Sequence, residues 1–270
     1  MASRLATPAC KLFRTLVVGA FVCPCVIWAQ RAPTSNERAN TNAGSTNSHS
    51  LAGIWGRASR IQVFSDQPPA FTAEGQAKFN ANKPGYGPRS VPPALGNDAM
   101  GTCDPLGIPR LLTLEVLPPY HRVEIFETSN RMLQHFEWHN YWREIWTDGR
   151  ELPKDPEPKW MGYSVGKWEG DAFVVNSFGF DGRTWLDHFG YPHSDEMRLQ
   201  ERYRLLDHDT LELTMTITDP RIYAKPWSSD KKILKLVPKG EIEESFCVPT
   251  EEQEFNNTVR NPAGGVTNKK

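Results

Sequence analysis

Apolar and polar side chains alternate with a period of two residues through much of the chain after Leu111. The clearest example has Leu211, Leu213, Met215 and Ile217 in alternation with glutamate and threonine residues. A strand directs successive side chains to opposite faces, so this pattern predicts a strand with one buried and one solvated face. The same reasoning predicts further strands over 121–127, 130–138, 140–147, 161–168, 171–178, 196–205 and 231–237.

Short turn signals separate these strands, including Asp148-Gly149 and Glu169-Gly170. No segment keeps a helical period over three turns, so a parallel sheet with crossover helices is not expected. Eight or so strands joined mostly by hairpins predict an antiparallel meander. A sheet with that many strands commonly closes on itself to remove its edges, so the pattern predicts an all-β barrel.

The first 29 residues have the pattern of a secretory signal peptide. Arg4, Lys11 and Arg14 precede an apolar run over 16–28, and the leader has no acidic residue. A membrane-spanning helix needs about 20 apolar residues, so this run is too short to be one. The small residue at its end predicts cleavage after Ala29. We therefore expect an exported mature protein, periplasmic or extracellular, without an integral membrane segment.

Composition divides the rest of the chain. Residues 30–50 are rich in Ser, Thr, Asn and Ala and predict a disordered linker, whereas 51–250 predict a single β-rich domain. Six prolines within 83–110 exclude regular helix or central strand there, which indicates a long Pro/Gly-rich arm laid over the domain. A brief helix capped by Thr72 is expected before this arm. The last segment, 251–270, is expected to be a flexible tail.

Removal of the leader changes the charge balance and the cysteine count. The mature chain keeps 28 basic residues against 32 acidic ones, so it has no basic excess that would hold nucleic acid. Of five cysteines only Cys103 and Cys247 remain after cleavage. In an oxidising compartment this pair predicts a disulfide that ties the arm to the last strand. The alternative is two unrelated buried thiols.

Two groups of residues resemble known families. Gly53-x-Trp55, ahead of the other strands, resembles the opening of the first strand in lipocalins and other calycins. That likeness implies an antiparallel meander closing into a calycin/lipocalin-like barrel with a cavity for a small apolar or amphipathic ligand. A longer block, from Gly166-Lys-Trp-Glu-Gly-Asp through Pro192-His-Ser-Asp to Glu201, resembles a family of secreted bacterial proteins of unassigned function.

The connection 178–196 is the richest in candidate chemistry. A hairpin does not need a connection of this length, and loops carried on a rigid sheet are where sites are usually built. It is therefore our first choice for an active or binding region, and the alternative is a solvated loop pinned by its aromatic residues. Its candidate residues are Asp181, Arg183, Trp185, Asp187, Tyr191 and His193.

Glu201 lies on the apolar face of its predicted strand, in phase with Tyr203. An isolated buried carboxylate is costly, so this glutamate is expected to be either paired or perturbed in its pKa. A perturbed carboxylate can serve as a general acid or base, with His193 as its partner. The alternative is a structural ion pair with an arginine such as Arg143 or Arg183.

Histidines and aromatic residues cluster over 135–146. His135, Glu137 and His139 would share one face of a strand, but Phe136 and Trp138 read as the core-facing set, so no metal site is predicted.

Tyr141 and Trp142 are candidates for lining a ligand cavity, and Trp142 would belong to an inward row with Glu144 and Trp146. The alternative is that these aromatic residues are ordinary core.

Three functions remain open from the sequence. The first is a barrel that binds a small apolar or amphipathic molecule in its interior, with the loop 178–196 and the arm closing its mouth. The second is a secreted acid–base enzyme, a hydrolase, lyase or isomerase, whose catalytic groups would be Asp181, Asp187, His193 and Glu201. The third is an envelope structural or interaction protein. No serine-nucleophile motif or phosphate-binding glycine loop occurs, and no cofactor is expected.

Overall fold

The computed structural model describes residues 50–58, 63–113 and 121–266. The expected signal peptide, and all of the expected linker except Ser50, lie outside the described residues.

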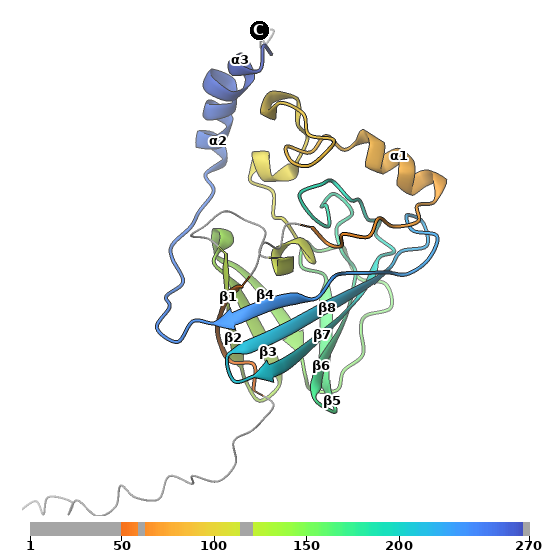
Figure 1. Ribbon diagram of the computed structural model, residues 1–270, viewed down its shortest axis with the longest axis vertical. Coiled ribbons are helices and arrows are strands. Elements are labelled where there is room, and N and C mark those ends of the chain that lie inside the picture. Colours follow the sequence, from red (N-terminus) through yellow and green to blue (C-terminus); the bar gives the residue numbers. More distant parts are fainter. Residues whose placement is uncertain (1–49, 59–62, 114–120, 267–270) are drawn as a thin grey trace, which may run out of the picture. The chain divides into compact units, whose positions relative to one another are not determined.

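Nine strands form a closed β-barrel, which confirms the predicted fold class (Figure 1). Consecutive strands are neighbours from β1 to β8, and β10 closes the barrel because it pairs with both β8 and β1. The short β9 pairs with β8. The strands are β1 Gly53–Arg57, β2 Arg122–Glu127, β3 Arg131–Phe136, β4 Tyr141–Trp146, β5 Tyr163–Glu169, β6 Ala172–Phe178, β7 Arg198–Asp207, β8 Thr210–Thr218, β9 Trp227–Ser228 and β10 Lys232–Leu236.

One pairing differs from the expected antiparallel meander. Strands β4 and β5 are parallel, with Trp146 opposite Val165, so the barrel is mixed. The cause is the connection 147–162, which runs back along the barrel before β5 begins, where a hairpin would have reversed the chain. A turn signal such as Asp148-Gly149 marks where a strand ends, but it does not show where the next strand begins.

The two-residue period selects the core as predicted. Leu211, Leu213, Met215 and Ile217 of β8 are all at most 1% exposed. Trp55 of β1 is also buried, and its indole nitrogen donates to the carbonyl oxygen of Leu51 at 2.8 Å. Side chains of this kind remove large apolar areas from water, and this supplies most of the favourable free energy of folding.

The two ends of the barrel differ in their connections. Short turns at 128–130, 170–171 and 208–209 join hairpin strands at one end. The strand directions place the β1–β2, β3–β4, β6–β7 and β8–β10 connections at the other end, which we call the loop end. Figure 1 shows the helices and irregular segments gathered there, above the barrel. The loop end is therefore where a site can be built from segments distant in sequence.

The expected helix and arm both occur at the loop end. Helix α1, Ala73–Ala81, is capped by Thr72, whose hydroxyl oxygen accepts from the backbone nitrogen of Gly75 at 3.0 Å. The arm that follows holds the short 3₁₀ helices Pro93–Leu95 and Ala99–Thr102, and a third at Arg110–Thr113 ends this described stretch. Short 3₁₀ pieces are what a proline-rich segment can form.

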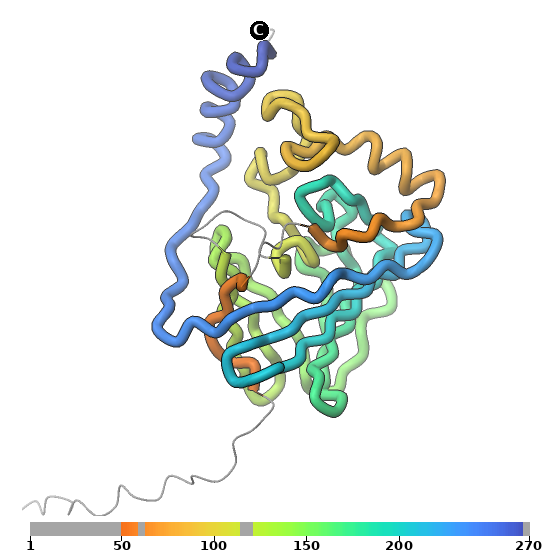
Figure 2. Tube along the Cα trace, viewed as in Figure 1, coloured from red at the N-terminus to blue at the C-terminus, as the bar shows by residue number. Residues whose placement is uncertain are grey.

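The C-terminal segment is helical over 249–263, whereas the sequence predicts a flexible tail from 251. It comprises α2 Pro249–Phe255, a π-helical stretch Asn256–Arg260 and α3 Asn261–Ala263. Figure 2 shows this C-terminal helix beside the arm. The two are joined by a hydrogen bond in which the side-chain amide of Asn256 donates to the carbonyl oxygen of Gly101 at 2.9 Å. Within the described residues, no helix is both long and apolar enough to cross a membrane.

The predicted disulfide between Cys103 and Cys247 is confirmed, with a Cα–Cα distance of 5.6 Å. Cys247 follows the last strand and comes just before α2, so the bridge ties the arm to the C-terminal helix instead of to the last strand. It joins residues 144 positions apart in the chain.

Replacing both cysteines, Cys103→Ser with Cys247→Ser, should lower the free energy of unfolding by about 3–5 kcal/mol, because a loop this long gains much freedom in the unfolded chain. Urea unfolding of the oxidised protein and the variant measures this difference. Dithiothreitol should destabilise the wild type and leave the variant unchanged. Equal urea midpoints for the two oxidised proteins would contradict the expectation.

Candidate functional site

A buried ion pair between Arg143 and Glu201 lies inside the barrel. The guanidinium donates to both carboxylate oxygens, at 2.6 and 2.9 Å, and both side chains are at most 1% exposed. Glu201 therefore faces inward, as its place in the strand pattern predicts. Its partner is Arg143, which corresponds to the structural ion pair that was the alternative to a catalytic carboxylate.

Neutral polar groups complete this interior network. The hydroxyl of Tyr203 donates to Glu201 at 2.7 Å, while Ser164, Ser177 and the side-chain oxygen of Gln134 accept from the guanidinium of Arg143. Burial opposes the charge of the arginine, but the neighbouring carboxylate outweighs it and raises the pKa of Arg143. Burial, and then the same carboxylate, raises the pKa of Tyr203 well above its usual value. The network is thus a fixed hydrogen-bonded core element.

His193 is fully buried and makes hydrogen bonds through both ring nitrogens. Nδ1 lies 3.0 Å from the carbonyl oxygen of Ser194, which makes it the protonated nitrogen, and Nε2 accepts from the hydroxyl of Thr184 at 2.6 Å. Burial lowers the pKa of His193. Across the described residues no interaction joins His193 to Glu201, so the acid–base pair suggested by the sequence is not brought together.

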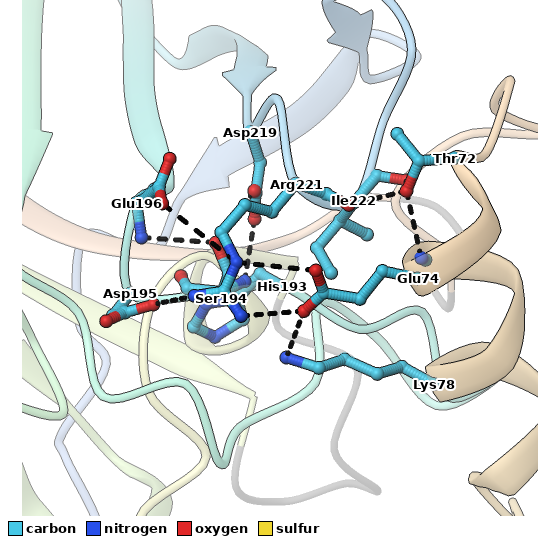
Figure 3. A network of polar contacts seen from close by, with 11 residues as sticks. Thr72, Glu74, Lys78, His193, Ser194, Asp195, Glu196, Asp219, Arg221 and Ile222 are labelled. Carbon is cyan, nitrogen blue, oxygen red and sulfur yellow. Dashed lines mark hydrogen bonds and ion pairs between the residues drawn. The ribbon is translucent and has the colours of Figure 1, made fainter.

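Next to His193, a polar network ties the β6–β7 connection to two other segments, as Figure 3 shows. The backbone nitrogen and hydroxyl of Ser194 both donate to the buried carboxylate of Asp219, at 2.6 and 2.8 Å. On the surface, Arg221 pairs with Glu74 of α1 at 2.7 Å and with Asp195 at 2.8 Å. Exposed pairs of this kind add little stability, and here they join α1 to the loop and to Arg221 at the surface.

The remaining charged candidates of this loop are separated. Asp181 pairs with Arg183 at 2.7 Å, and the guanidinium of Arg183 lies over the ring of Trp160 at 4.3 Å on an exposed surface. Asp187 is fully buried, and its carboxylate accepts from the backbone nitrogens of Phe64 and Phe189, both at 2.9 Å. These carboxylates therefore hold the loop in place, and no interaction between the two is found within the described residues.

Trp185 and Tyr191 pack into the layer above the barrel. Trp185 is 6% exposed, and the guanidinium of Arg110 lies 5.8 Å from its ring. Tyr191 stacks on Phe79 of α1 at a centroid distance of 4.8 Å. These contacts correspond to the alternative in which aromatic residues pin the loop.

Trp142 points away from the barrel interior, which corrects the predicted inward row. Its side chain is 50% exposed and stacks on His135, whereas Arg143 and Ile145 are the buried residues of β4. The strand carries aromatic residues on both faces and a charged residue on the inner one, so hydrophobicity alone gave the wrong phase. Tyr141 is on the inner side of this strand and packs against the core.

The segment 135–139 does not form one strand face. Strand β3 ends at Phe136, and Glu137 turns inward, where it accepts from the backbone nitrogens of Arg122 and Glu243, both at 3.1 Å. No group of three metal-ligating side chains occurs in the described part of the chain.

A cavity of about 620 Å³ lies between the arm and the C-terminal helix. No local sequence pattern predicts this cavity, because three segments far apart in the chain form its walls. Most of its lining side chains are apolar. The lining residues are Gly85, Tyr86, Pro92, Pro93, Gly96, Asp98, Met100, Gly101, Trp138, Glu252, Phe255, Val259, Arg260, Ala263 and Gly264.

One wall of the cavity is fixed by a second ion pair. Asp98 receives two hydrogen bonds from Arg110, each 2.8 Å long, and Arg110 is 1% exposed. Burial opposes the charge of this carboxylate, but Arg110 outweighs it and lowers the pKa of Asp98. A bidentate pair of this geometry holds the arm rigidly at the loop end.

The other walls come from the β3–β4 turn and the C-terminal helix. Trp138 belongs to a turn in which His139 and Asn140 both have positive φ, 52° and 54°. At Gly101 a Cβ atom would lie 2.4 Å from Nη1 of Arg260, so a larger residue there would displace the end of this arginine side chain. Tyr86, Phe255 and Val259 are 47%, 50% and 51% exposed, which leaves the cavity with an apolar rim.

Comparison of the chain with protein-family models, curated proteins and solved structures gave no significant match. The barrel, its loop end and the cavity are therefore the basis on which function is inferred.

Replacing Arg143 alone, as Arg143→Met, should cost about 3–5 kcal/mol of unfolding free energy, because Glu201 is left as an unpaired buried charge. The double variant Arg143→Met with Glu201→Leu should be more stable than this single variant. Urea unfolding of both variants gives the comparison. A double variant no more stable than the single one would show that the charge pair is not the source of the effect.

His193 should make stability depend on pH. Its pKa in the folded protein is lowered from 6.5 by burial, so below that pH the unfolded chain binds a proton that the folded chain excludes. Its contribution to stability is therefore complete above about pH 6.5 and is lost progressively as the pH falls below that value.

In His193→Gln this decrease of the unfolding free energy at low pH should be absent. Urea titrations between pH 5 and 7 measure how the unfolding free energy depends on pH. The absolute stability of the variant is not the readout, because the hydrogen bond with Thr184 also changes. An unchanged slope would contradict the assignment.

Proposed function

We propose that this chain is an exported barrel protein that binds a small, partly apolar molecule in the cavity between the arm and the C-terminal helix. The observation that carries the proposal is the cavity itself. Its volume of about 620 Å³ lies within the roughly 300–1,000 Å³ range of ligand sites. Its lining combines an apolar majority with a few fixed polar groups, which is the usual composition of such sites.

The position of the cavity differs from the barrel interior that the sequence suggests. The interior near Arg143 is occupied by a hydrogen-bonded ion pair with four neutral partners. A ligand there would have to replace several of those hydrogen bonds, and each buried polar group left unsatisfied costs about 1–3 kcal/mol. The cavity at the loop end requires no such loss. The resemblance of Gly53-x-Trp55 to calycins would then apply to the barrel fold but not to the position of the bound ligand.

The disulfide supports both export and the site. Structural disulfides persist in oxidising compartments, which agrees with the secretory leader expected over 1–29. Cys103 follows directly after a cavity-lining 3₁₀ helix, and Cys247 comes just before α2. The bridge therefore clamps two walls of the cavity together, which limits the entropy that a ligand must remove on binding.

The acid–base enzyme has less support. His193 makes hydrogen bonds through both ring nitrogens, and Arg143 holds both oxygens of Glu201. Neither group has an unoccupied atom pointed at a substrate position. An envelope interaction protein would bind its partner through exposed apolar residues. The exposed apolar residues at the cavity rim, Tyr86, Phe255 and Val259, surround the entrance for the ligand instead.

A cavity-filling variant tests the proposal. Ala263 lines the cavity from α3, so Ala263→Phe should occupy its space. The neutral fluorophore N-phenyl-1-naphthylamine should bind the oxidised wild type with enhanced emission. Its dissociation constant should rise at least tenfold in the variant, since the apolar contact area is lost.

The matched control is Thr258→Phe, which adds the same ring to the same helical segment outside this cavity. It should bind the fluorophore like the wild type. Equal binding by Ala263→Phe and the wild type, or no binding by the wild type, would refute the proposed site.

A further inference from the structure

We infer that the ligand carries an anionic group, which Arg260 of the C-terminal helix binds. This inference rests on the proposed function and narrows it to amphipathic anions, such as long-chain or aromatic carboxylates and sulfonates. The central observation is the charge of the cavity wall, where the guanidinium of Arg260 has no carboxylate partner among the residues that the structure describes.

Arg260 is held in place by neutral acceptors. Its Nε donates to the carbonyl oxygen of Pro93 at 3.0 Å, and Nη1 donates to the side-chain oxygen of Asn256 at 3.2 Å. Nη2 donates to no acceptor among the described residues, and the guanidinium forms no ion pair there. Two of its nitrogens thus fix the orientation of the group, and the third stays available at the cavity wall.

The acidic residues of the lining do not neutralise Arg260. Asp98 is fully engaged, because Arg110 and the backbone nitrogen of Met100 donate to its carboxylate. Glu252 also lines the cavity, but it forms no ion pair within the described part of the chain. The cavity wall therefore carries two charged groups. Hydrogen bonds hold the guanidinium of Arg260 in place, whereas no ion pair among the described residues holds the carboxylate of Glu252.

The apolar surroundings favour an anion with an apolar body. Trp138, Met100 and Phe255 give the cavity apolar walls, and a charge-assisted hydrogen bond from a guanidinium is stronger beside such walls than in bulk water. A guanidinium also matches the planar geometry of carboxylates. A ligand that places its acid group at Nη2 and its apolar body against these three side chains would satisfy both parts of the site.

Two fluorescent probes distinguish the contribution of the ligand's negative charge from that of its apolar part. 1-Anilinonaphthalene-8-sulfonate has the aromatic skeleton of N-phenyl-1-naphthylamine plus one sulfonate. The oxidised wild type should bind the sulfonate more tightly. In Arg260→Gln the affinity for the sulfonate should fall about tenfold while that for the neutral probe stays within about twofold. Arg260→Lys, which keeps the charge, should retain part of the preference.

Glu252→Gln is the opposite control, because it removes from the same wall a carboxylate that has no ion pair within the described ranges. It should tighten binding of the sulfonate and leave the neutral probe unchanged. Raising the salt concentration should weaken only the sulfonate in the wild type.

The inference would be overturned if Arg260→Gln lost the same affinity for both probes, or if the wild type bound the two probes equally well. Either result would leave the proposed site intact. If neither probe binds the wild type, the proposed function fails together with the inference.

Discussion

Strand β10 closes the barrel, and this closure determines where the other segments of the chain can lie. Because β10 pairs with β1 on one side and β8 on the other, the nine-stranded barrel has no open edge. The chain can then leave the barrel only at its ends, and three of the connections at one end are short turns. The arm, the β6–β7 connection and α1 are thereby brought together at the loop end, where they form the second layer of the structure.

Two buried ion pairs serve different parts of this arrangement. Arg143 and Glu201 join β4 to β7 through the barrel interior, while Asp98 and Arg110 hold the arm at the loop end. Each carboxylate receives two hydrogen bonds from its arginine, which is the geometry that offsets the cost of removing charges from water. The first pair fills the interior, and the second shapes the wall of the cavity. The disulfide then fixes the C-terminal helix as the opposite wall.

The sequence predicts the barrel well because its signal is local. Alternation predicts β2 to β8 and β10, but not β1 or β9. It also places Glu201 on the inner face, since Tyr203 and its other neighbours of the same phase are apolar. The same logic fails in β4, where Trp142 is more hydrophobic than Arg143 but lies outside. There the carboxylate of Glu201, more than 50 residues away in the chain, stabilises the arginine inside. No pattern within one strand contains that information.

The period of apolar residues could not predict the cavity, for a related reason. Met100, Trp138 and Phe255 belong to a 3₁₀ helix, a hairpin turn and a C-terminal helix, and only the three-dimensional fold brings them together. The cysteines gave the one sequence signal for this proximity. The residues after 250 are mostly charged or polar, so their composition predicted a tail instead of a docked helix.

The most direct test of this account is a crystal structure of the oxidised mature protein with a brominated N-phenyl-1-naphthylamine. We expect an anomalous bromine peak in the cavity, between Met100 of the arm and Phe255 of α2. A peak inside the barrel beside Arg143, or no ordered bromine at the loop end, would contradict it.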